Sequence, residues 1–198
     1  ALGAAIEVAS RHGEPTDFIM EHAYWGPEYS SDEIQSFLDE AKIHYSRPSD
    51  IEQAVAERLA AGDIVGWFQG RMEIGPRALG GRSILANPSM AEMKDRVNAE
   101  VKHREGWRPF APSMHEEQAS NLVFDSYPSP FMLLTFTVRP EWRDMLRASM
   151  HVDNTVRSQT VSRKTNPRYH GMIKKFFELT GVPAVLNTSF NDRGEPIV

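Results

Sequence analysis

The sequence predicts an α/β fold, because short apolar or alternating runs typical of strands are separated by segments of helical periodicity. Strands are expected in five segments: 64–68, 84–86, 131–138, 155–161 and 182–186. The helical segments between them begin after capping residues and end at glycine or proline. A chain of 198 residues can bury a core and accommodates one domain with an appendage.

The helices before the first strand are predicted from caps and apolar spacing. Residues 1–9 have a helical pattern, and a short helix is expected from Ser31. Ser49 precedes a further helix and forms a capping box with Glu52, three residues later. Gly62 ends that helix, because glycine readily adopts the left-handed conformation beyond a last turn.

The later helices are predicted in the same way. Ser89 opens a second capping box before a helix, and residues 105–113 follow as a loop that two prolines stiffen. Pro140 and Pro167 are each expected in the first turn of a helix, where proline is well tolerated. Gly181 ends the last of these helices.

The composition indicates a protein that binds a discrete anion rather than a long polyanion. The net charge of −5 argues against nucleic-acid binding by the whole surface. Within residues 69–113, however, eight cationic side chains accompany only five acidic ones. The absence of cysteine fits a reducing cytoplasm, and the sequence has neither a signal-peptide pattern nor an apolar run that could span a bilayer. We therefore expect a cytoplasmic protein without a membrane partner.

Residues 69–86 form the most distinctive stretch, a glycine-rich turn between two apolar runs. Arg71, Arg77 and Arg82 carry planar, permanently charged groups that suit phosphate or carboxylate oxygens. Pro76 stiffens the turn beside Arg77. The spacing of a Walker loop is absent. An anion-binding hairpin is therefore one interpretation, and a solvated hairpin with ordinary surface arginines is the alternative.

Further motifs follow the hairpin. In chain order, the motifs are Gly70–Gly80, Arg82–Leu85, Asn98–Lys102, Arg104–Glu105, Trp107–Ser113, His151–Asp153, Arg157, Gln159–Val161, Asn187–Asn191 and Gly194–Pro196. Together they resemble the C-terminal region of the O-carbamoyltransferase family, which includes nodulation and antibiotic-tailoring carbamoyltransferases. The resemblance covers roughly residues 62–198, and several motifs in the right order are far more specific than one glycine pattern.

The resemblance implies a fold of the YrdC/Sua5 type, a twisted mixed β-sheet with flanking helices. It also implies that residues 1–45 are the tail of, or a connector from, an N-terminal Kae1-like domain outside this sequence. Residues 46–198 are then a YrdC-like domain truncated at its C-terminal end. Because both ends look cut from a longer polypeptide, we expect residues 1–45 to pack loosely or to pair with a second copy as a homodimer.

The same resemblance implies that this domain makes carbamoyl adenylate from ATP and carbamoyl phosphate, and that the Kae1-like domain passes the carbamoyl group to a hydroxyl. The residues that would carry catalysis are Lys102, Arg77 and Arg157. The residues that would bind substrate and nucleotide are Asn187, Ser189, Arg71, Arg104, Arg108 and Ser113. Fixed cations with amide and hydroxyl donors would neutralise a triphosphate. Mg²⁺ is expected to arrive held by the ATP.

Two alternatives concern nucleic acid and metal. A YrdC-like module could bind RNA through a basic face, but the sequence lacks the interleaved exposed aromatics that single-strand binding requires. Without a His-x-x-x-His pair or a cysteine cluster, we predict no metal ligated by this segment. His151 and Asp153 leave both an acid–base pair and a structural role open, and Asn154 follows them where the family usually has glycine.

Overall fold

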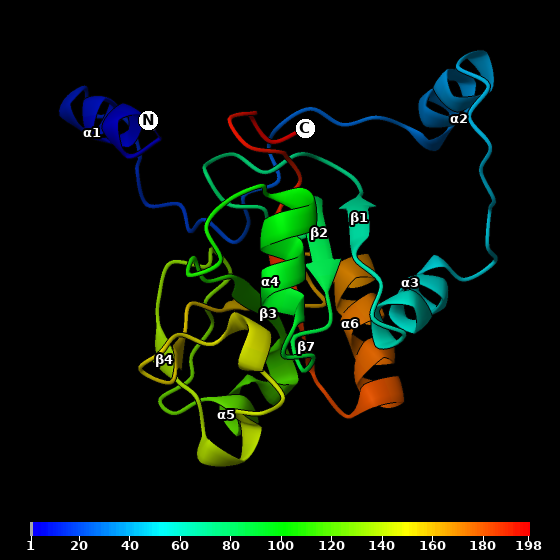
Figure 1. The fold of residues 1–198 in the computed structure, drawn as a ribbon. Helices are drawn as coiled ribbons and strands as arrows, with labels where there is room; N and C mark the ends of the chain where they lie inside the picture. The colour runs from blue at the N-terminus through cyan, green and yellow to red at the C-terminus, as the bar shows by residue number, and fades with distance from the viewer. Residues whose placement is uncertain (1) are drawn as a thin grey trace.

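The computed structural model describes residues 2–198, whose centre is a mixed five-stranded sheet (Figure 1). Its strands are β1 (Val65–Phe68), β2 (Arg82–Ala86), β3 (Ala111–His115), β6 (Gln159–Val161) and β7 (Ala184–Ser189), in the spatial order β1-β2-β7-β3-β6. Neighbouring strands are antiparallel except β3 and β6, which are parallel. The predicted mixed sheet with flanking helices is therefore confirmed.

Helices cover both faces of this sheet. On one face, α3 (Ile51–Ala60) packs against α6 (Pro167–Thr180), and on the other lies α4 (Met93–Arg96) with a π-helical turn, Val97–Val101 (Figure 1). Successive strand residues point to opposite faces. Leu85 and Val185 accordingly join the apolar cluster beneath α3 and α6, whereas Ala86 and Leu186 join the cluster beneath α4.

The ends of α3 and α6 show which capping signals are used. In α6 the Asn166 side chain accepts the N–H of Tyr169, and Gly181 closes the helix with a φ of 75°. The predicted capping box at Ser49 is wrong, because Asp50 caps α3 instead by accepting the N–H of Gln53 at 3.0 Å. A carboxylate at this position also interacts favourably with the helix dipole.

The predicted capping box at Ser89 is also wrong. The Asn87 side chain accepts both the N–H and the hydroxyl of Ser89, at 3.0 and 2.8 Å. This local turn occupies the hydroxyl that would have capped the helix. The helix consequently begins only at Met93, without a side-chain cap, and changes to the π-helical turn after Arg96.

The segment between β3 and β6 is less regular than predicted. The expected strand 131–138 shrinks to β4 (Phe136–Thr137), which pairs with β5 (Thr155–Val156) in a separate two-stranded sheet. Leu133 and Leu134 are exposed, so the apolar run does not correspond to a buried strand. Short helical turns make up much of the remainder: Glu116–Gln118, α5 (Ala119–Leu122), Pro140–Trp142 and Arg147–Ser149.

Strand β3 was not predicted, because Pro109 and Pro112 indicate a loop. Pro112 nevertheless lies inside β3, opposite Leu186 of β7. Strand β6 pairs with β3 only from Ser113 onward, so Pro112 has a neighbouring strand on one side alone. A missing N–H is tolerated at such a position, as at a sheet edge.

Residues 2–45 divide into projecting helices and one tightly held segment. Neither α1 (Leu2–Arg11) nor α2 (Ser31–Glu40) has a buried residue, and both stand away from the body (Figure 1). Between them, residues 23–27 run beside residues 72–74, with hydrogen bonds of 2.8–2.9 Å at Ala23, Gly26 and Pro27. The prediction of loose packing thus describes the two helices and is wrong for residues 23–27, which we call the strap.

Candidate functional site

The glycine-rich loop between β1 and β2 is shaped by the buried carboxylate of Glu73. One of its oxygens accepts the N–H of Leu79 at 2.6 Å and that of Gly81 at 2.7 Å. Gly80 has a φ of 100°, and a Cβ there would lie 2.2 Å from the Tyr169 ring. Only glycine meets both demands, so the loop has one conformation, which carries Arg77 on its outer turn.

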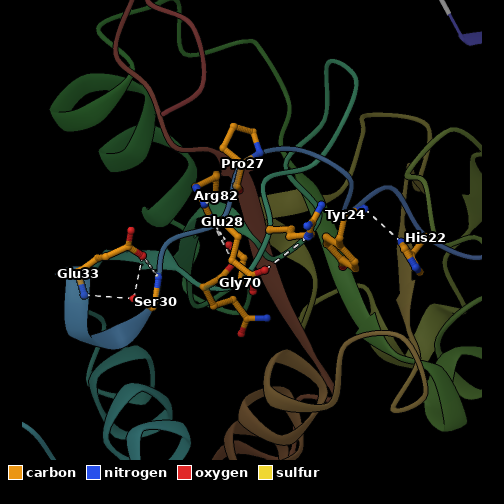
Figure 2. Close-up of polar contacts among 10 residues, drawn as sticks. His22, Tyr24, Pro27, Glu28, Ser30, Glu33, Gly70 and Arg82 are labelled. Carbon is orange, nitrogen blue, oxygen red and sulfur yellow. Dashed lines mark hydrogen bonds and ion pairs between the residues drawn. The ribbon is translucent and has the colours of Figure 1, made fainter. Parts of the chain in front are cut away.

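The three arginines of this loop have different surroundings. Arg82 is 1% exposed and donates to the main-chain oxygens of Gln69, Gly70 and Gly81 at 2.9–3.1 Å and of Pro27 at 3.4 Å (Figure 2). Burial lowers the pKa of Arg82 from its usual value. Arg71 is exposed and forms an ion pair with Glu28 at 3.4 Å. The interpretation of all three as anion ligands is therefore wrong for Arg82, whose guanidinium is saturated by the protein.

Arg77 instead lines a cavity of about 580 Å³ at the end of the sheet where β7 finishes. Four separate parts of the chain form its walls: the glycine-rich loop, the loop before β3, the segment around β5, and the end of β7. Its polar or aromatic lining residues are Arg77, Arg104, Trp107, Arg108, Phe110, Thr135, His151, Arg157, Asn187, Thr188 and Ser189. We call this space the arginine cavity. Six of the predicted site residues line it: Arg77, Arg104, Arg108, Arg157, Asn187 and Ser189.

The four cavity arginines form no close ion pair with any carboxylate in the part of the chain that the structure describes. Among residues 2–198, no carboxylate lies within 4.0 Å of the side-chain nitrogens of Arg77, Arg104, Arg108 or Arg157. The Nε atoms of Arg77 and Arg157 are inaccessible to solvent and have no hydrogen-bond partner in the described chain. Burial, and then the positive charge of Arg77, lower the pKa of Arg157. Such unpaired buried donors are costly unless a ligand accepts from them.

Arg104, Trp107 and Arg108 bring a basic and aromatic wall to the cavity. The Arg104 Nε donates to Asn98 at 2.7 Å, and its guanidinium lies 4.8 Å from the centre of the Phe110 ring. Burial, followed by the charge of Arg108, lowers the pKa of Arg104. Trp107 is 74% exposed between these two arginines. The statement that no exposed aromatic interrupts the basic residues is therefore wrong at Trp107, which sequence reasoning missed as a site residue.

A buried polar network supports the floor of the cavity. The Asn187 Nδ2 donates to the Ala78 carbonyl at 3.0 Å and to the Ser113 hydroxyl at 2.9 Å, and that hydroxyl donates to Gln159 at 2.7 Å. Asn187 lines the cavity, and its buried Oδ1 has no partner in residues 2–198. Ser113 does not line the cavity and acts here as a support for Asn187.

Lys102 does not join the other site residues. Its ammonium contacts four oxygens of Ser189 and Asn191 at 2.5–3.2 Å, and Lys102 is absent from the cavity lining. Burial, followed by the charge of Arg104, lowers the pKa of Lys102 to about 8. From the sequence we expect Arg77, Lys102, Arg157, Asn187 and Ser189 to converge in one cavity, and this holds for all but Lys102. Arg71, a further candidate ligand residue, lies outside the cavity in an exposed ion pair.

His151 was weighed as part of an acid–base pair, and the structure links it to Asp153 through Thr155. The Thr155 hydroxyl donates to Asp153 at 2.7 Å and lies 2.9 Å from the His151 Nδ1. Since the only hydroxyl hydrogen goes to Asp153, His151 donates from Nδ1, which leaves Nε2 as the nitrogen free for other partners. Asn154 has a φ of 61°, so asparagine keeps the left-handed turn that the family usually forms with glycine.

The donor set of the arginine cavity excludes a carboxylate-held metal. No aspartate or glutamate is among its lining residues, so a divalent ion there would have to be carried by an anionic ligand. Elsewhere, in residues 2–198, His115, Glu117 and His170 place potential ligand atoms within 4.8 Å of one another. The sequence does not reveal this group, because His170 lies more than 50 residues beyond His115 and Glu117.

The fold is that of a YrdC-like domain. Full-length HypF, crystallised in a phosphate- and nucleotide-bound form, matches with a TM-score of 0.51 at 20% identity, over 78% of this chain and 19% of that one. HypF of T. kodakarensis matches with a TM-score of 0.50 at 17% identity, over 77% of this chain and 19% of that one. HypF contains a YrdC-like domain, so these likenesses establish the fold.

The sequence comparisons identify the family. Residues 56–198 match the family described as Carbamoyltransferase C-terminus. The whole chain is 47% identical to nodulation protein NolO of Bradyrhizobium diazoefficiens and 48% identical to nodulation protein NolNO of Sinorhizobium fredii, of which it covers 37% and 30%. The chain therefore belongs to the carbamoyltransferase family and corresponds to about a third of the length of these relatives. No helix within residues 2–198 has the length and apolar character needed to cross a membrane.

Proposed function

We propose that this chain binds ATP and carbamoyl phosphate in the arginine cavity and forms carbamoyl adenylate there. The observation that carries the proposal is a group of four arginines that, within residues 2–198, have no carboxylate within 4.0 Å, and two of them have buried, unpaired Nε donors. Phosphate oxygens are the natural acceptors for such planar donor groups. A cavity of about 580 Å³ also lies within the range of small-molecule sites.

Each wall of the cavity has its own role in this proposal. Arg77 and Arg157 neutralise the phosphates at the closed end, where their guanidinium groups are half-buried. Arg104 and Arg108 neutralise phosphate at the more exposed wall, and Trp107 supplies a flat surface on which adenine stacks. Asn187 and Ser189 can donate to and accept from the carbonyl and amine of the carbamoyl group. Positioning and charge neutralisation are the main contributions a protein makes to phosphoryl and nucleotidyl chemistry.

The proposed reaction balances with one water molecule. Water and carbamoyl phosphate give carbamate and inorganic phosphate, and a carbamate oxygen then attacks the α-phosphorus of ATP. The bond between that phosphorus and the bridging oxygen breaks, and pyrophosphate leaves with the electron pair. Negative charge develops on the departing pyrophosphate, so permanently charged arginines favour the transition state. Mg²⁺ enters with the nucleotide, since the cavity has no carboxylate to hold it.

The second half of the proposed activity lies outside these residues. Relatives of this chain are about three times as long, which leaves room for the Kae1-like domain that would pass the carbamoyl group to a hydroxyl. Carbamoyl adenylate is reactive, so a water-excluding path between the two sites would protect it. We assign residues 1–45 to the connection with that domain and residues 46–198 to the adenylate-forming domain, in the cytoplasm.

RNA binding remains the second candidate because Trp107 is exposed between Arg104 and Arg108. One stacking surface beside a closed cavity suits a single base better than a strand, which needs a series of such surfaces along a groove. A strand would also show a steep inverse dependence of affinity on salt. We therefore favour the mononucleotide.

The test is exchange of labelled pyrophosphate into ATP by the complete carbamoyltransferase polypeptide. Exchange should require carbamoyl phosphate, and Arg157→Ala should reduce it strongly because Arg157 has no partner in the protein to share its charge. Arg71→Ala is the matched control, since Arg71 lies outside the cavity and pairs with Glu28. If exchange is absent in an enzyme that still carbamoylates its acceptor, or if both variants behave alike, adenylate formation in this cavity is ruled out.

A further inference from the structure

A group of three potential metal ligands lies at the opposite end of β3 from the arginine cavity. His115 ends β3, Glu117 follows in the next helical turn, and His170 lies on α6. A single oxygen of Glu117 is 2.9 Å from the His170 Nε2 and 3.0 Å from the His115 Nδ1. The two imidazole rings are 4.0 Å apart between their centres. Ala111, at the other end of β3, borders the arginine cavity, so the two places are separate.

His115 is the least satisfied member of this group. It is 7% exposed, and neither ring nitrogen has a hydrogen-bond partner in residues 2–198. Its contact with Glu117 is close enough for an ion pair but lacks hydrogen-bond geometry. His115 thus packs beside a second buried histidine and a carboxylate but forms a hydrogen bond with neither. A buried polar side chain of this kind normally has a partner, which a bound ligand would supply here.

The spacing of the three ligand atoms suits a small tetrahedral ion. Two ligands about 2.0–2.1 Å from Zn²⁺ lie about 3.3 Å from each other in tetrahedral geometry. The observed contacts of Glu117 with His170 and His115, at 2.9 and 3.0 Å, need only a few tenths of an ångström of expansion. All the pairwise distances are within 4.8 Å, so no backbone movement is required.

We propose that His115, Glu117 and His170 bind a divalent transition-metal ion, of which Zn²⁺ best fits two imidazoles and one carboxylate. Three protein ligands leave a fourth position open, as in zinc sites that bind a water or a substrate group. That position opens into a second cavity of about 670 Å³, which these three residues also line. The ion would in addition join β3 to α6 across more than 50 residues of sequence.

The charges around this second cavity determine what completes the coordination. Arg163, Arg168, Lys174 and Lys175 line it together with Glu52, Glu117 and Glu178. Lys174 pairs with Glu178 and Lys175 with Asp50, which leaves Arg163 and Arg168 as the lining cations that can contact an anionic fourth ligand on the ion. The fourth ligand is therefore an oxyanion such as a carboxylate or phosphate, or a hydroxide from bound water, rather than a neutral base.

The test uses the 198-residue chain after treatment with a chelator and its removal. Zn²⁺ is titrated in competition with a chromophoric chelator, and Co²⁺ is added separately to record its visible absorption, which is intense in four-coordinate sites. We expect one ion per chain and a four-coordinate Co²⁺ spectrum. Glu117→Gln and His170→Gln should each weaken binding at least about tenfold, since even second-shell changes cost about 10–100-fold. Inorganic phosphate should strengthen binding to the parent chain.

His44→Gln is the matched control, because His44 is exposed in the segment between α2 and α3. It should bind Zn²⁺ as the parent chain does. Glu117 is itself exposed, so Glu117→Gln keeps the proposal testable even if a histidine variant fails to fold. If the chain binds no Zn²⁺ or Co²⁺, or if Glu117→Gln binds as tightly as His44→Gln, the three residues form a metal-free cluster and the proposal is overturned.

Discussion

The ammonium of Lys102 donates to the main-chain oxygen of Ser189 at 2.5 Å, joining residues that are 87 positions apart. This contact fixes the end of β7, which forms one wall of the arginine cavity. Lys102 therefore acts through Ser189 and Asn191 as a positioning residue, while Arg77 and Arg157 are left to contact the ligand. Among residues 2–198, Lys102 thus has its hydrogen bonds to the protein, whereas the buried Nε atoms of Arg77 and Arg157 have no protein partner.

Lys102→Met should loosen the end of β7 and so weaken the site. The change removes the ammonium from four oxygens of Ser189 and Asn191, but the Ser189 main-chain oxygen keeps the N–H of Asn191 and the Asn191 Oδ1 keeps the Ser189 hydroxyl. Because the cost of burying the ammonium is removed as well, the free energy of unfolding should change little near pH 7. In the complete enzyme, adenylate formation should fall more than transfer from supplied carbamoyl adenylate. Urea unfolding and the two half-reactions measure these effects. Equal loss of both half-reactions would contradict a role confined to the arginine cavity.

The stability of the chain should depend on pH through Lys102. Its pKa is lowered from 10.5 to about 8, so between these values the unfolded state binds more protons than the folded state. Stability therefore rises with pH across this window, and the cost of burying the charge applies in full below about pH 8. Urea midpoints at about pH 7 and pH 10 should show this contribution in the parent chain and not in Lys102→Met. An identical pH slope in both would refute it.

Arg77→Ala should lower the affinity for ATP without lowering stability. Arg77 has no ion-pair or hydrogen-bond partner within residues 2–198 whose loss could weaken the fold. Removing one charge-assisted bond to phosphate is expected to cost about 1.5–3 kcal/mol of binding free energy. Calorimetry on the parent chain, Arg77→Ala and Arg71→Ala provides the comparison. Arg71→Ala should bind normally, and unchanged affinity in Arg77→Ala would remove Arg77 from the site.

Arg82→Lys should show the opposite behaviour, with a loss of stability despite the retained charge. The planar Arg82 group reaches the carbonyls of Gln69, Gly70 and Pro27 together, which a single ammonium cannot do. These contacts are part-buried and the Pro27 carbonyl keeps the N–H of Met72, so the loss of charge-assisted bonds to Gln69 and Gly70 is expected to cost about 1.5–3 kcal/mol. Denaturant unfolding should therefore show a lower midpoint in Arg82→Lys than in Arg71→Lys. Similar midpoints would mean that Arg82 is not required for the loop.

Trp107→Ala should distinguish stacking of adenine from binding of phosphate. The side chain is exposed, so its removal should leave stability nearly unchanged. Loss of one base–aromatic stack is expected to weaken ATP binding by about 1–3 kcal/mol, while affinity for inorganic pyrophosphate stays the same. Competition binding with both ligands checks this difference. A parallel loss for pyrophosphate would place Trp107 in the phosphate site instead.

The elements that sequence reasoning predicted well are those specified by local signals. Helix α6 has its proline, its periodic apolar face and its glycine stop within one segment, and all three agree. Strand β3 was missed because Pro112 is unfavourable locally and is accommodated only by the late start of β6. The length of the strand in residues 131–138 was overestimated, because the sequence does not show whether a leucine is buried. Leu133 and Leu134 are in fact exposed.

The site shows the same division between local and tertiary information. Motif resemblance singled out Arg77 and Arg157, but their shared lack of a protein partner appears only when the loops meet. Lys102 was predicted as a ligand residue because the sequence shows its charge. The sequence does not show that its ammonium forms hydrogen bonds with oxygens nearly 90 residues further along the chain. A metal site was sought only as histidines spaced along one helix. His115 at the end of a strand and His170 on a helix do not have that spacing, so their proximity was not predicted.

The strap has a consequence for where the chain tolerates changes of length. Residues 23–27 pair with residues 72–74, so one amino acid inserted within the strap would shift that pairing by a position and displace the loop that carries Arg77. Residues 41–49, in contrast, are all exposed and run between α2 and α3 without an equivalent pairing. Insertions and deletions among family members should therefore accumulate in residues 41–49 and be rare in the strap.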